Sequence, residues 1–78
     1  MYKVLIVDDE IMIRRGLSKI IHWEEIGFEM AGAVGNAMEA LELIKKTPVD
    51  VLLTDISMPE MTGLELIHQV RKILPGLK

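Results

Sequence analysis

The sequence contains no cysteine, so disulfide bonds and thiolate metal sites are excluded. Aromatic residues make up only 4% of the chain, which leaves no cluster on which nucleic-acid bases could stack. Apolar runs are short, and the run at the N-terminus, Val4 to Val7, ends at a pair of aspartates. A signal peptide needs a longer run, and a membrane-spanning helix needs about 20 apolar residues. We therefore expect a soluble, cytoplasmic protein that does not enter a membrane.

Positive charge is also in short supply. Nine Lys and Arg residues stand against twelve Asp and Glu residues, the net charge is −3, and the basic residues are scattered along the chain. Binding to nucleic-acid phosphates requires a clustered positive face, so we expect no nucleic-acid binding by this chain itself. A length of 78 residues allows one domain at most, and an apolar fraction of 50% is typical of a globular domain.

Three apolar runs alternate with three amphipathic stretches. The run at residues 3–7 is rich in β-branched residues and predicts a strand, as does the run at 49–54, and a weaker strand is predicted at 28–34, where Phe28, Met30 and Val34 alternate with other residues. Helices are predicted from Glu10 to near His22, from an N-cap at Asn36 to just before Pro48, and from Thr62 or Gly63 to just before Pro75. Strands that alternate with helices of this length favour an α/β fold of the order βαβαβα, with a parallel sheet covered by helices on both faces.

Each predicted helix carries an apolar stripe that should face the sheet. The residues assigned to these stripes are Ile13, Leu17, Ile20 and Ile21 in the first helix, Ala37, Ala40, Leu41 and Ile44 in the second, and Leu64, Ile67, Val70, the stem of Arg71 and Leu74 in the third.

Three aspartates follow the predicted strands. Asp8 and Asp9 come directly after the first strand, and Asp55 follows the third. In parallel sheets, ligands bind outside the carboxyl ends of the strands. If these two strands are neighbours, three carboxylates converge there, and unpaired carboxylates repel one another. Mg²⁺ prefers such oxygen ligands, so the sequence predicts a magnesium site.

Acidic residues after a strand also have a simpler interpretation. Carboxylates at the start of a helix stabilise the helix dipole, and Glu10 fits that role. Asp8 and Asp9 taken alone would fit it too, but Asp55 at the end of a different strand favours the metal site.

Two stretches match the pattern of a known protein family. "VLIVDDE", followed by Arg14, and then "VDVLLTDISMPEMTG" resemble the receiver domain of bacterial two-component response regulators. The resemblance covers all 78 residues and implies part of a flavodoxin-like, CheY-like doubly wound sheet with the strand order 2-1-3. "IHWEEIGFEMAGAVGNAMEAL" looks like the subgroup whose receivers precede an AraC-type DNA-binding domain, which implies transcription regulation by the full-length protein.

The resemblance also implies a role for individual residues. Asp55 would accept a phosphoryl group from a phosphohistidine of a partner sensor histidine kinase, so the chain would assist its own phosphorylation without being a turnover enzyme. Asp8, Asp9 and Asp55 would hold Mg²⁺ together with the backbone carbonyl of Ser57. The residues that would shape the loop are Met58, Pro59 and Gly63.

A complete receiver is expected to extend beyond the elements found here. Its sheet has the strand order 2-1-3-4-5, and the resemblance places a Ser or Thr after the fourth strand and a Lys after the fifth. We therefore expect residues 1–78 to be the N-terminal part of a receiver domain. Strand 49–54 would then be an apolar open edge, which is a template for pairing with another chain. This predicts self-association, by edge pairing or by exchange of elements between chains.

Other residues have less specific interpretations. His22 and His68 are expected to have surface or packing roles, Met58 and Met61 to pack, and Arg14 and Arg15 to lie on a solvated helix face. Two further functions remain open. One is a small Mg²⁺-dependent phosphatase, which would need a general acid near Asp55, although the position two residues later is Ser57. The other is a receiver-like assembly domain that is never phosphorylated, against which the presence of all three aspartates argues.

Overall fold

The computed structural model describes residues 1–56, 58 and 61–78. Its strands are β1 (Tyr2–Val7), β2 (Phe28–Val34) and β3 (Val51–Thr54), and its helices are α1 (Ile11–Ile20), α2 (Ala37–Lys46) and α3 (Gly63–Ile73), with a short 3₁₀ helix at Trp23–Ile26. The predicted element order is confirmed. The predicted third strand begins too early, because the regular strand starts at Val51 rather than Val49.

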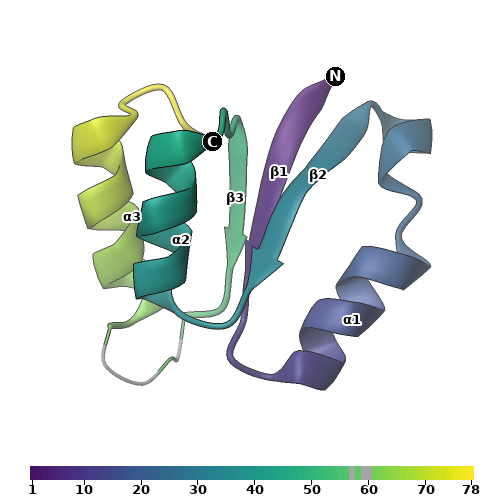
Figure 1. Ribbon diagram of the computed structural model, residues 1–78, viewed down its shortest axis with the longest axis horizontal. Coiled ribbons are helices and arrows are strands. Elements are labelled where there is room, and N and C mark those ends of the chain that lie inside the picture. Colours follow the sequence, from purple (N-terminus) through teal and green to yellow (C-terminus); the bar gives the residue numbers. More distant parts are fainter. Residues whose placement is uncertain (57, 59–60) are drawn as a thin grey trace.

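The three strands form a parallel sheet in the order β2-β1-β3 (Figure 1). Helices α2 and α3 cover one face of the sheet, and α1 lies on the other. This is the predicted doubly wound arrangement, in which β1 is the central strand. Its residues Val4 to Val7 are almost completely buried, as expected for a strand with a neighbour on each side and helices on both faces.

Local sequence signals explain where the two helices on the α2/α3 face begin. The Asn36 side chain accepts a hydrogen bond from Glu39 N at 2.9 Å, as predicted for an N-cap. At the start of α3, Thr62 and Glu65 form a complete capping box. Both helix starts are therefore anchored at the end of the sheet where the β-strands finish.

The main apolar core lies between the sheet and the helices α2 and α3. The predicted stripe of α2 is confirmed, since Ala37, Ala40 and Ile44 are buried. The stripe of α3 was partly wrong: Leu66 is buried beside Val70, while Leu64 is 64% exposed. Gly63, Leu66 and Val70 recur at spacings of three and four residues, which places them on one face of the helix and turns Leu64 away from it.

Helix α1 is amphipathic but less buried than predicted. None of its residues is fully buried, and Ile13 and Ile20 are 45% and 77% exposed. The reason is that α1 contacts mainly β2 and that, in the described part of the chain, no second α-helix lies on its face of the sheet, where its neighbour is the short 3₁₀ helix Trp23–Ile26. In the residues that the structure describes, no helix has the length and apolar character needed to cross a membrane.

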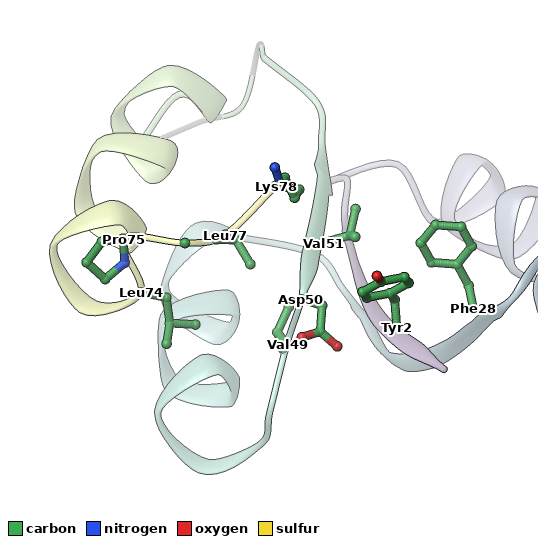
Figure 2. A pocket seen from close by; sticks show the side chains of 10 residues that line it. Tyr2, Phe28, Val49, Asp50, Val51, Leu74, Pro75, Leu77 and Lys78 are labelled. Carbon is green, nitrogen blue, oxygen red and sulfur yellow. The ribbon is translucent and has the colours of Figure 1, made fainter.

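The outer edge of β3 is partly covered by the end of the chain. Lys78 N donates a hydrogen bond to Asp50 O at 3.1 Å, and Leu52 N donates one to Lys78 O at 2.9 Å. These two bonds form a parallel bridge opposite Val51, and Figure 2 shows Leu77 and Lys78 beside this part of β3. The prediction of a fully open edge is therefore wrong for residues 50–52, because the last residues fold back onto the strand.

Self-association stays a prediction for the remainder of this edge, where Leu53 is 41% exposed. Sedimentation of the 78-residue chain should show a species larger than the monomer that grows with concentration. Leu53→Lys should restore the monomer, since a charged residue in an edge strand opposes pairing with another chain. Leu64→Lys, on the exposed side of α3, should leave the distribution unchanged. A single monomeric species at every concentration would contradict the prediction.

Candidate functional site

Asp8 and Asp9 lie where β1 ends. The pairing of β1 with β2 continues one residue past the strand, because Asp8 N donates to Val34 O at 3.1 Å. One carboxylate oxygen of Asp8, Oδ1, accepts a hydrogen bond from Glu10 N at 2.9 Å. The first of the two aspartates is thus held both by the neighbouring strand and by the turn that leads into α1.

Asp55 lies at the corresponding end of β3. Val7 of β1 pairs with Thr54 of β3, and Asp55 N donates to Val7 O at 2.9 Å. The side chain of Thr54 donates to the carbonyl oxygen of Asp55 at 3.0 Å. Parallel pairing of two adjacent strands therefore brings Asp55 beside the residues that follow Val7.

The three predicted aspartates form one cluster. One carboxylate oxygen from each of Asp8, Asp9 and Asp55 lies within 4.8 Å of the other two. Asp8 and Asp55 are half-buried, and Asp9 is exposed to solvent. Oxygens on opposite sides of a Mg²⁺ ion are about 4.2 Å apart, since each lies about 2.1 Å from the metal. The cluster's limit of 4.8 Å is slightly wider than this, so the three carboxylates suit a Mg²⁺ ion that some of them would hold directly and others through its bound water molecules.

The loop after β3 packs closely against the start of α3. Gly63 N donates to Ile56 O at 2.8 Å, and Gly63 is buried. A Cβ atom at this position would overlap the carbonyl oxygen of Asp55 and would lie 2.9 Å from Ile56 Cα. Met58 belongs to the main core and is 8% exposed, so its side chain packs as predicted. Two predictions concern residues outside the described part of the chain. These are the metal ligand predicted at the backbone carbonyl of Ser57 and the loop-shaping role predicted for Pro59.

One residue near the site was assigned to the wrong environment from the sequence. Arg14 was expected on a solvated helix face, but its Nη1 donates a hydrogen bond to Asp8 O at 2.7 Å and its side chain is half-buried. Arg15 is exposed, as expected. The sequence did carry a signal for this contact. Arg14 lies one helical turn after Glu10, and long helical side chains point back toward the N-terminus of their helix, which here is the turn of Asp8 and Asp9. His22 and His68 are both exposed, in agreement with the surface roles expected for them.

An apolar cavity of about 650 Å³ lies at the other end of the sheet (Figure 2). Its lining includes the rings of Tyr2 and Phe28, residues 49–51 and the last five residues of the chain. Tyr2 and Phe28 are the first residues of β1 and β2, so this cavity is separated from the aspartates by the length of the strands. The candidate site is therefore the aspartate cluster and not this cavity.

The sequence matches a known family over almost its whole length. Residues 4–78 match the family described as the response regulator receiver domain. The transcriptional regulatory protein YesN of Bacillus subtilis is 41% identical over 78 residues, and the chemotaxis protein CheY of Thermotoga maritima is 42% identical over 76 residues. The chain spans 21% of the length of YesN and 62% of that of CheY, so each match concerns one part of the relative.

Solved structures show the same fold. A two-component transcriptional regulator AraC from Clostridium phytofermentans superposes with a TM-score of 0.91 at 35% identity, over 100% of this chain and 63% of that one. The REC domain of AraT, a response regulator from Geobacillus stearothermophilus, superposes with a TM-score of 0.88 at 45% identity, over 96% of this chain and 58% of that one. Sequence and structure thus point to the same kind of domain.

Proposed function

The chain belongs to the response regulator receiver domain family of two-component systems, and from this premise we propose that Asp55 is its phosphoryl acceptor. The donor would be a phosphohistidine of a sensor histidine kinase, and the transfer would depend on Mg²⁺. The observation that carries the proposal is the cluster of Asp8, Asp9 and Asp55 at the carboxyl ends of β1 and β3. This is the end of a parallel sheet at which ligands bind.

The proposed reaction is a direct displacement. A carboxylate oxygen of Asp55 attacks phosphorus, the bond from phosphorus to the imidazole nitrogen breaks, and the imidazole keeps that electron pair and takes up a proton. A bound Mg²⁺ supplies positive charge that offsets the negative charge on the carboxylate and on the phosphoryl group. Asp8 and Asp9 would hold the ion beside Asp55. The hydrogen bond from Asp55 N to Val7 O holds the backbone of the acceptor in place.

We also propose how the chain fits into a longer protein. Residues 1–78 would be the N-terminal part of a receiver domain, which the partial coverage of the Clostridium regulator and of the AraT domain supports. The likeness to the Clostridium regulator, which is described as an AraC transcriptional regulator, supports an AraC-type DNA-binding output in the full-length protein, and the likeness to YesN supports a role in transcription regulation. An acyl phosphate on Asp55 would add charge and acceptor oxygens at one point, which can shift a two-state element toward its active form.

The proposal is tested by phosphorylation of the full-length protein with acetyl phosphate, read as intact mass. One phosphoryl adduct should form when Mg²⁺ is present, and no adduct should form when EDTA is added before acetyl phosphate to remove the metal. Equal adduct formation with and without Mg²⁺ would contradict the metal dependence. Steady release of phosphate from a phosphomonoester would instead support a phosphatase.

The metal site makes a separate prediction. Asp9→Asn should raise the dissociation constant for Mg²⁺ at least about tenfold, because even the loss of a group outside the metal's immediate ligands commonly costs 10–100-fold in affinity. Isothermal calorimetry of the full-length protein measures this constant. Glu10→Gln removes the same charge from the adjacent residue, which lies outside the cluster, and should change the constant far less. Equal effects of the two substitutions would show that Asp9 acts only through its charge.

A further inference from the structure

Arg14 of α1 contacts the turn that carries two of the three aspartates. We propose that its guanidinium group is a positioning element, which holds the Asp8–Asp9 turn so that the carboxylates face Asp55 and thereby sets the affinity for Mg²⁺. This inference rests on the proposed function, because it assigns a role in the same metal site. Arg14 itself would not touch the metal or the phosphoryl group.

The first support is the way in which Asp8 is held. Arg14 Nη1 donates to Asp8 O at 2.7 Å, which is the short distance typical of a hydrogen bond from a charged donor. Asp8 N donates to Val34 O, and Asp8 Oδ1 accepts from Glu10 N. The backbone oxygen of Asp8 is therefore held by Arg14, its N–H by β2, and one of its carboxylate oxygens by the next turn. Of these three contacts, only the one from Arg14 comes from a side chain that reaches back from α1.

The second support is the space in which the guanidinium group lies. A Cβ atom at Gly35 would lie 2.8 Å from Arg14 Nη1 and 3.4 Å from its Cζ. The backbone of Gly35 does not have the positive φ that favours glycine, which among the glycines occurs only at Gly27. Gly35 therefore provides room for the guanidinium group rather than an unusual backbone conformation. Two segments that are distant in sequence, the start of α1 and the loop after β2, thus meet at this contact.

The third support is the choice of acceptor. Arg14 donates to a backbone carbonyl, and among the described residues no ion pair joins it to Asp8 or Asp9. A salt bridge to these carboxylates would compete with a metal for them. The observed contact fixes the turn and leaves the carboxylates available as ligands. Positioning and simple electrostatics therefore predict opposite results when Arg14 is removed.

The test measures Mg²⁺ affinity of the full-length protein by calorimetry. Loss of a positive charge beside an acidic site should by itself tighten Mg²⁺ binding, whereas loss of positioning should weaken it. We expect Arg14→Ala to raise the dissociation constant about tenfold, within the range seen when a group behind a metal ligand is removed. Arg14→Lys keeps one donor and should recover part of the affinity. Arg15→Ala removes the same charge from the exposed neighbouring residue and should leave the affinity unchanged or slightly tighter.

Two further measurements keep the inference testable if Arg14→Ala folds poorly. Gly35→Ala keeps the charge but displaces the guanidinium group, so it should also weaken Mg²⁺ binding. In the metal-free protein, the amide hydrogen of Glu10, which is bonded to Asp8 Oδ1, should exchange faster in Arg14→Ala and Gly35→Ala than in Arg15→Ala. Unchanged or tighter Mg²⁺ binding in both Arg14→Ala and Gly35→Ala would overturn the inference. Failure of the unsubstituted protein to bind Mg²⁺ would instead overturn the proposed function, and the exchange rates would still test the role of Arg14.

Discussion

Replacing Asp55 by asparagine should abolish the phosphoryl adduct that acetyl phosphate forms on the full-length protein. The amide oxygen of asparagine is a far weaker nucleophile than a carboxylate, and removal of a nucleophile commonly lowers a rate by about 1,000-fold or more. Asparagine has nearly the same shape, and the backbone bond from residue 55 to Val7 O does not depend on the side chain. Intact-mass measurement before and after incubation reports the adduct directly.

The matched control for this substitution is Asp50→Asn. Asp50 precedes β3, at the end of the sheet opposite to the aspartate cluster, and its carboxylate accepts a hydrogen bond from Lys3 N at 2.8 Å. An asparagine can accept the same bond, so this variant should be phosphorylated like the unsubstituted protein. An adduct that persists in Asp55→Asn and is lost in another aspartate variant would move the acceptor to that other residue.

Gly63→Ala should be among the most destabilising single substitutions in this chain. The added methyl group would overlap the carbonyl oxygen of Asp55 and would lie 2.9 Å from Asp55 C and from Ile56 Cα, all of which are backbone atoms that cannot rotate away. Overpacking of this kind typically costs up to about 3 kcal/mol and occasionally more. In a domain of about 60–100 residues, each kcal/mol lost from the free energy of unfolding lowers the melting temperature by about 4–8 °C. Urea and thermal denaturation followed by circular dichroism measure both quantities.

Gly76→Ala supplies the control, since a Cβ atom at Gly76 would meet nothing within 4 Å and its φ is not positive. Its free energy of unfolding should change by less than about 0.5 kcal/mol. If Gly63→Ala is as stable as Gly76→Ala, α3 does not begin in close contact with the backbone of Asp55. If Gly63→Ala remains folded, its Mg²⁺ affinity should fall as well, because the loop that carries Asp55 must move.

The order of the elements follows from local patterns, and the structure agrees with it. The run Val4 to Val7 is apolar at every position because β1 is the central strand, with a neighbouring strand on each side and helices on both faces of the sheet. The capping of α2 by Asn36 could be predicted because it depends on residues three positions apart.

The burial of the apolar stripe of α1 could not be predicted in this way. An apolar face shows that a helix packs somewhere, but it does not show how much of that face is covered, and Ile20 is mostly exposed.

By itself the sequence determined that three aspartates stand at the ends of two strands in an alternating α/β chain, because periodicity and strand ends are properties of neighbouring residues. The tertiary structure alone decided that their carboxylates come within 4.8 Å, since this depends on the pairing of β1 with β3. It also decided that Arg14 reaches Asp8 O, that Gly63 lies against Asp55, and that Lys78 covers part of the edge of β3. Lys78 meets β3 because the packing of α3 on the sheet returns the chain to that strand, whereas Arg14 and Gly63 contact residues only a few positions earlier, and these contacts depend on how α1 and α3 pack.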